Sequence, residues 1–278
     1  MSRAGFWRRL LRNGTGFAGF LICVAIIVLA VFAPQLATHG PTEQVIRDRF
    51  QAPGQGYLLG TDNFGRDLWS RILYGYRSSI SIAVGAVAFA AILGTAVGLA
   101  AAWFGGATDR ILMRLMDILL AFPIILLAIG ILAVLGPGGF NVALAIGIVY
   151  LPIFARLSRA PTLSVLSWDY VAAARALGAN GPRIVLKHVL PNIMAPMLVQ
   201  LTLSLSTAIL VEASLSFLGL GTQPPTPSLG LMLASSRDTM LLSPWPGVFS
   251  GLAILLASFG FNLFGDGLRD LLDPSLRT

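Results

Sequence analysis

Charged side chains are scarce in this sequence. They make up 11% of the 278 residues, while 56% of the residues are hydrophobic. Soluble domains contain about 25% charged residues, because their surfaces face water. The shortage excludes a soluble globular domain, and the apolar excess excludes a disordered chain. The composition therefore predicts a protein whose surface faces lipid.

Cysteine, histidine and nucleotide-binding motifs are also rare or missing. The single cysteine, Cys23, has no partner for an intrachain disulfide. His39 and His188 fall on opposite sides of the membrane in the topology below, and no H-E-x-x-H motif occurs. No G-x-x-x-x-G-K-[ST] loop is present to bind the phosphates of ATP. We therefore expect no catalytic residues, metal or cofactor, and we expect that the chain is not an enzyme.

Long apolar segments are abundant. A helix needs about 20 apolar residues to cross the bilayer core with all its backbone groups paired. The run Gly136-Pro137-Gly138-Gly139 predicts a tight hairpin inside a long uncharged stretch, because glycine and proline end helices. We predict an all-α integral membrane protein with six spans, at residues 17–37, 80–104, 111–135, 142–155, 193–220 and 247–265.

The basic residues indicate the orientation, because Lys and Arg near span ends tend to stay in the cytoplasm. With the N-terminus inside, the cytoplasmic segments hold 13 Lys and Arg, and the external segments hold six. Both termini are therefore expected in the cytoplasm. The basic residues form no continuous stripe with aromatics, so the expected partner is membrane lipid and not nucleic acid. The predicted parts are an interfacial segment (1–16), a first span (17–37), an extracytoplasmic segment (38–79), a core of five spans (80–266) and a cytoplasmic tail (267–278).

A few polar residues fall inside predicted spans. Glu212 lies in the fifth span, where a carboxylate is costly unless it faces protein or water. It lines a translocation path together with Ser216, or it pairs with a backbone group or a partner residue near the outer surface; both interpretations stay open. Asp117 follows Arg114 by three residues, which favours a structural pair over a proton relay. Gly94 and Gly98 form a G-x-x-x-G step that favours close helix packing within the chain.

The longest predicted cytoplasmic connection joins the fourth and fifth spans and has its own structure. Asp169 can cap a helix over residues 170–177, and Gly178 suits its left-handed C-terminal end. Pro182 can open a second helix, and Pro191 can begin the fifth span. A short helix between two spans can pass force from a cytoplasmic partner into the membrane, or it can simply anchor the loop. The residue pattern alone leaves both open.

The same connection resembles the EAA loop of ABC importer permeases, through residues 172–178 (AAARALG) and 188–191 (HVLP). In that family the loop forms a coupling helix that docks into a cleft of the ATPase subunit. Ala172 stands where the family has glutamate, and His188 stands where isoleucine is common. Within a coupling loop at 157–192, the resemblance implies ATPase-coupling roles for Asp169, Tyr170, Ala172, Ala173, Ala174, Arg175, Leu177, Gly178, Leu190 and Pro191.

Three further blocks resemble the dipeptide, oligopeptide and nickel importer permeases, in the branch of the second of their two paired subunits. They lie at residues 60–71, 212–228 and 262–274. The resemblance implies a MetI-like type I importer fold in a bacterial or archaeal cell membrane. It implies as partners a second homologous permease, two ATPase subunits and an extracytoplasmic solute-binding protein, and a peptide or related small solute as cargo.

The alternative is a secondary transporter driven by an ion gradient, with Glu212 or Asp117 as the proton carrier. The sequence shows no inverted repeat of the kind that many such transporters contain.

Overall fold

The computed structural model describes residues 13–54 and 56–272, and every regular element within them is helical. The predicted fold class is therefore confirmed. The interfacial residues before 13 and the Asp273-Pro274 pair lie outside the described residues. The elements are α2 (Gly14–Val31), α3 (Ala33–Leu36), η1 (Ile46–Asp48), α4 (Leu68–Phe104), α5 (Gly106–Leu120), α6 (Ile124–Leu135), α7 (Gly139–Leu166), α8 (Asp169–Ala176), α9 (Gly181–Ile184), η2 (Val185–Val189), α10 (Leu190–Phe217), α11 (Leu229–Ser236), η3 (Arg237–Thr239) and α12 (Trp245–Leu272).

Within the described residues, five helices are long and apolar enough to cross a membrane, or six if α5 and α6 together form one span. Several are longer than the apolar segments predicted. Helix α4 begins at Leu68 instead of residue 80, and α7 continues to Leu166 instead of residue 155. Hydropathy detects only the apolar part of a helix, whereas the polar extension of α4 is held by its N-cap: the Asp67 carboxylate accepts a hydrogen bond from the Ser70 N–H.

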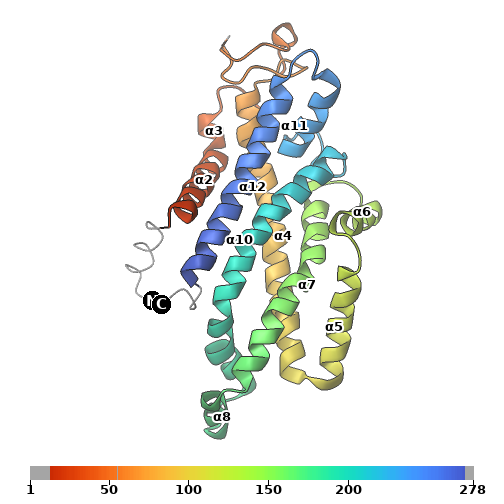
Figure 1. The fold of residues 1–278 in the computed structure, drawn as a ribbon. Coiled ribbons are helices and arrows are strands. Elements are labelled where there is room, and N and C mark those ends of the chain that lie inside the picture. Colours follow the sequence, from red (N-terminus) through yellow and green to blue (C-terminus); the bar gives the residue numbers. More distant parts are fainter. Residues whose placement is uncertain (1–12, 55, 273–278) are drawn as a thin grey trace.

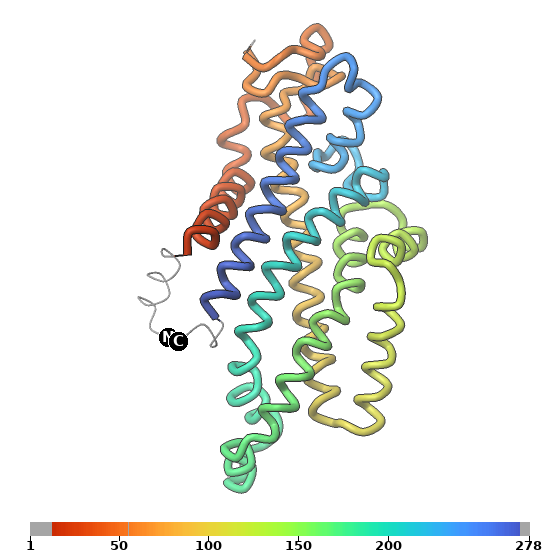
Figure 2. The backbone as a smooth tube through the Cα atoms, in the orientation of Figure 1, coloured from red at the N-terminus to blue at the C-terminus, as the bar shows by residue number. Residues whose placement is uncertain are grey.

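The third predicted span is not a single straight helix. Helices α5 and α6 meet at a bend of 95°, where the tube in Figure 2 turns sharply. Pro123 is the N-cap of α6; it has no N–H to continue α5, and its ring disfavours helical backbone at the preceding residue. Both halves are apolar, so hydropathy merged them. The predicted hairpin after α6 is confirmed, since Gly136 and Gly138 both have positive φ angles, of 82° and 143°.

Helix α4 lies at the centre of the bundle, in contact with α2, α7, α10 and α12 (Figure 1). Its closest neighbour is α7, and glycines make that approach possible. A Cβ on Gly94 would lie 2.5 Å from the carbonyl oxygen of Leu151, and one on Gly98 would lie 2.2 Å from that of Ala155. The G-x-x-x-G step therefore packs within the chain, as predicted.

The connection between α3 and α4, residues 37–67, is held by buried polar side chains at the end of the bundle opposite α8 (Figure 1). Asp62 accepts from the Arg66 Nε at 2.6 Å and lies 3.5 Å from the Arg71 Nε, and Arg71 is only 3% exposed. The Tyr57 hydroxyl donates to Asp48 at 2.8 Å, and this bond, together with burial, raises the pKa of Tyr57. Residues 45–71, which include the block at residues 60–71, thus form one structural cluster, which we call the α3–α4 knot.

Candidate functional site: the loop between α7 and α10

The predicted short helix is present as α8, at one end of the bundle (Figure 1). Its predicted cap was wrong. Trp168 occupies the N-cap position with extended backbone, and Asp169 is the first helical residue. The carboxylate of Asp169 therefore faces the positive end of the helix dipole, and Arg175 lies in the last turn, near its negative end.

One side chain of α8 is buried, and most of the others are exposed. Val171 is fully buried, and α8 makes its helix contacts with α7 and α9. Ala172 and Ala173 are exposed, and Ala174 is half-buried. Three of the exposed residues of α8 are alanines (Ala172, Ala173 and Ala176), which makes this part of the helix thin enough to enter a cleft on another protein.

The C-terminal end of α8 presents a large apolar side chain. Gly178 has a φ of 86°, and its N–H donates to the Arg175 carbonyl at 3.0 Å, which closes the helix in a left-handed turn as predicted. Leu177, immediately before that glycine, is 89% exposed. Trp168, Tyr170 and Leu186 of the same loop are also exposed, and several exposed apolar side chains in one loop are typical of a protein–protein contact.

Tyr170 connects α8 to the start of α10. Its ring lies 5.7 Å from the rings of Trp168 and His188. The Asn192 amide donates to the Tyr170 hydroxyl at 3.2 Å and to the His188 carbonyl at 2.6 Å. Asn192 was not predicted as a site residue. Its only sequence signal is its position directly after Leu190-Pro191.

Trp103, at the end of α4, connects the same loop to the centre of the bundle. The Arg175 guanidinium lies 5.4 Å from the centre of a Trp103 ring, within cation–π range. A Cβ on Gly181 would lie 2.8 Å from that indole, so only glycine allows this approach. Sequence analysis missed Trp103, because it is far from the loop along the chain.

The second half of the loop is continuous with the fifth span. Helix α9, the π-helical turn η2 and α10 form one helix of 37 residues, Gly181–Phe217. Pro191 has no N–H for the carbonyl four residues before it, which favours the wider π turn at this point. Leu190 is the first, partly buried residue of α10, and Pro191 is exposed beside it. The loop is therefore joined to the membrane-spanning part of α10 without a break in the helix.

Glu212 and Ser216 lie on the buried side of α10. Both are fully buried, and the Ser216 hydroxyl donates to the Glu212 carboxylate at 2.7 Å. Gly230 packs so closely on this turn that a Cβ there would lie 2.2 Å from the Ala213 carbonyl. In this conformation the pair is enclosed between α10, α11 and α4. Their assignment to a translocation path stays a prediction.

Asp117 has a different partner from the one predicted. Instead of Arg114, the Arg156 guanidinium of α7 contacts its carboxylate. A second pair, Asp109 with Arg159, also joins α5 to α7, at 2.5 Å. Spacing along one helix suggested an internal pair, but α7 runs alongside α5 and supplies the cations.

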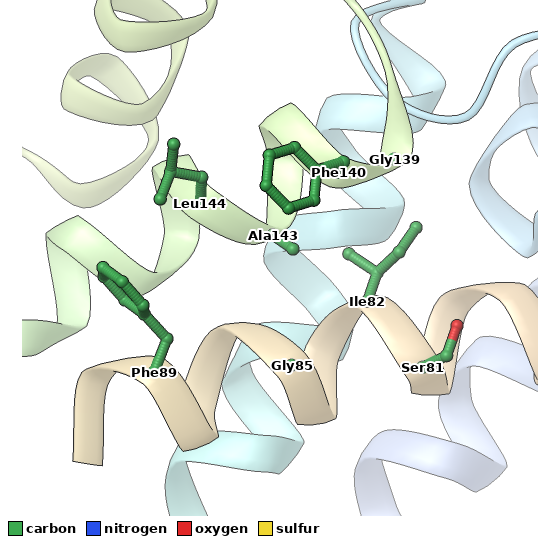
Figure 3. A pocket seen from close by; sticks show the side chains of 8 residues that line it. All are labelled: Ser81, Ile82, Gly85, Phe89, Gly139, Phe140, Ala143 and Leu144. Carbon is green, nitrogen blue, oxygen red and sulfur yellow. The ribbon is translucent and has the colours of Figure 1, made fainter. Parts of the chain in front are cut away.

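An apolar groove lies between α4 and α7 (Figure 3). Its only side-chain polar atom is the Ser81 hydroxyl, so it offers a polar solute almost no hydrogen bonds. The groove is lined by Ser81, Ile82, Gly85, Phe89, Gly139, Phe140, Ala143 and Leu144.

Comparison with known proteins agrees with this architecture. Residues 90–278 match the family of binding-protein-dependent transport system inner membrane components, and residues 3–53 match the N-terminal transmembrane domain of oligopeptide transport permease C. A di/tripeptide transport system permease protein, DppC, of Pseudomonas aeruginosa is 47% identical over 98% of this chain and 92% of its own. A glutathione transport system permease protein, GsiD, of Pectobacterium atrosepticum is 42% identical over 98% and 91%.

The fold has a solved counterpart. A chain of the MetNI methionine ABC transporter, in an inward-facing conformation, matches 73% of this chain and 96% of its own with a TM-score of 0.59 at 17% identity. The predicted MetI-like fold is therefore confirmed. Neither the matching families nor these relatives support the gradient-driven alternative. The chain belongs to the family of binding-protein-dependent transport system inner membrane components.

Proposed function

We propose that this chain is the permease subunit of an ATP-binding cassette importer for peptides or a related small solute. It forms half of the translocation pathway in a bacterial cell membrane, and both termini lie in the cytoplasm. A second homologous permease, two ATPase subunits that hydrolyse ATP, and an extracytoplasmic solute-binding protein complete the transporter. The cargo class follows from relatives named for di/tripeptide and glutathione transport.

The observation that carries the proposal is the form of the loop between α7 and α10. Helix α8 is thin, anchored by Val171, and followed by a leucine that is 89% exposed. The loop continues as one helix into the membrane. When the ATPase subunits close on ATP, they move α8, and α10 tilts with it, because a continuous helix transmits displacement along its axis.

The residues with proposed coupling roles divide into three kinds. Leu177 and the exposed alanines enter the ATPase cleft, Gly178 shapes the turn, and Tyr170 holds α8 to α10. Ala172 cannot form the ionic contact that a glutamate there allows, so docking at that position depends on apolar packing.

The test replaces Leu177 with glutamate. With the ATPase subunits co-expressed, Leu177→Glu lowers their co-purification with the permease about tenfold or more, and ATP-driven peptide uptake falls with it, since a central apolar anchor contributes about 2 kcal/mol or more to binding. Leu241→Glu is the matched control: this leucine is also fully exposed, at the other end of the bundle. Unchanged ATPase association in Leu177→Glu contradicts the proposal, as does peptide uptake by vesicles without ATPase subunits.

A further inference from the structure

The exposed side of α10 carries a row of uncharged polar side chains. Asn192, Gln200, Thr207 and Ser214 follow each other at steps of eight, seven and seven residues. At 3.6 residues per turn they stay within about 80° of one side of the helix, which also carries Pro196, Leu203 and Leu210. Thr207 and Asn192 are exposed, and Gln200 and Ser214 are half-buried. We call these four residues the α10 polar stripe.

The stripe lies on the side opposite Glu212 and Ser216. Each of those residues is two positions from Ser214, which places it about 200° away around the helix. The Glu212 side faces α4, where Ser79 lies beside the carboxyl group. Figure 1 shows α10 passing in front of α4, between α12 and α7. The stripe therefore lies on the outer side of α10, and at Thr207 it borders α7, whose Tyr150 side chain lies beside the Thr207 hydroxyl.

The exposed residues of α2 after Thr15 and of α12 up to Phe259 are all apolar, whereas those of α10 include Asn192 and Thr207 beside Met194, Leu198, Leu210 and Phe217. On α2, the exposed large side chains are Leu21, Val24, Ile27, Val28 and Val31, and on α12 they are Val248, Leu252, Leu255, Leu256 and Phe259. Apolar faces of this kind are stable in contact with the hydrocarbon tails of lipids. An amide such as that of Gln200 is not, because leaving an amide unpaired in an apolar medium costs about 2–7 kcal/mol. Its Nε2 donates to Ser204 at 3.1 Å, and an amide has a second donor hydrogen and an acceptor oxygen besides.

The stripe begins at the coupling loop. Its first residue, Asn192, is the one that donates to the Tyr170 hydroxyl of α8. Movement of α8 therefore acts on the same helix that carries the stripe, and changes its position relative to anything on the other side.

We propose that the α10 polar stripe is this subunit's wall of the translocation pathway, an inference that rests on the proposed function. Glu212 is the one ionisable residue between Leu190 and Phe217, and it faces the other way. The wall thus offers hydrogen bonds without fixed charge. It suits zwitterionic or neutral solutes rich in amides, such as peptides, and it does not select between acidic and basic side chains.

The test uses thiol accessibility in the assembled transporter. Cys23 is the single cysteine and is buried, so Cys23→Ala provides the background. Gln200→Cys, Thr207→Cys and Ser214→Cys are compared with Leu252→Cys on the apolar face of α12. The probe is a membrane-impermeant, cationic methanethiosulfonate. We expect the stripe thiols to react about tenfold faster than the control, because a thiolate forms only where water reaches it. We also expect ATP to change their rates, and a saturating tripeptide to slow them.

Two outcomes separate this inference from the proposed function. If ATP-driven uptake is intact and all three stripe thiols react as slowly as Leu252→Cys in every state, the face is covered by lipid or by the second permease and the inference is wrong. If the stripe thiols react but no ATP-driven uptake occurs, the proposed function fails, while the stripe still faces water.

Peptide uptake provides a second test, which can be used if the cysteine variants assemble poorly. Gln200→Met lowers peptide uptake about fivefold at an unchanged membrane level, since one hydrogen bond contributes about 1 kcal/mol. Leu252→Met leaves uptake unchanged. Equal uptake in both variants contradicts the inference.

Discussion

The two polar ends of this bundle are built in opposite ways. The α3–α4 knot has its polar side chains inside: Asp62 and Arg71 are both at most 5% exposed, and they hold each other. The loop between α7 and α10 has its apolar side chains outside, with Leu177 89% exposed. A buried polar network fixes one geometry, because each unpaired member is costly. An exposed apolar tip is complete only with a partner. One end therefore has a fixed geometry, and the other carries the surface at which we propose that the ATPase subunit binds.

The largest effect is expected at Gly65 in the knot. Its φ is 69°, and a Cβ there would lie 1.8 Å from the Val45 carbonyl oxygen. Gly65→Ala should cost about 4–5 kcal/mol of stability or prevent folding. Gly54→Ala is the control, because Gly54 also has positive φ, of 99°, but no atom within 4 Å of its Cβ position; strain alone costs about 1–2 kcal/mol. Thermal unfolding in detergent measures both, and equal values contradict the packing argument.

A smaller loss of stability is expected for Asp62→Asn. The change leaves the guanidinium of Arg71, 3% exposed, without its anionic partner, at a cost of about 3 kcal/mol. The control is Asp238→Asn, since the Arg237–Asp238 pair is open to solvent and should contribute nothing measurable. The same unfolding measurement applies. If the two variants are equally stable, the knot does not depend on its buried ion pair.

The smallest expected effect distinguishes a role in transport at one end of the bundle from a role in stability at the other. Tyr170→Phe removes the hydrogen bond from Asn192. This bond is exposed, so water replaces it; we expect an unchanged melting temperature but fewer peptides moved per ATP hydrolysed. Tyr57→Phe removes the bond to Asp48 in the knot, and should lower the melting temperature without changing that ratio. Uptake and ATP hydrolysis are measured together in reconstituted vesicles. The opposite pattern would reverse the roles assigned to the two ends.

The loop between α7 and α10 shows how much of the structure local sequence patterns can predict. The helix over 170–177 and the left-handed Gly178 were predictable, because alanine propensity and glycine's freedom at positive φ act within one turn. The bond between Tyr170 and Asn192 and the contact of Arg175 with Trp103 were not. They join residues on different elements, and no local pattern states which elements meet.

The sequence alone determined that the chain is helical and lies in lipid, because hydropathy and backbone pairing depend only on composition along the chain. It also determined the family, through motifs in order. Tertiary structure decided which partner Asp117 takes, that the third apolar segment bends by 95° at Pro123, and which side of α10 is buried. Glu212 attracted the first hypothesis because it is charged, yet it faces α4, and the polar face of the same helix points outward. Orientation about a helix axis depends on which neighbours pack against it, and only the folded bundle supplies them.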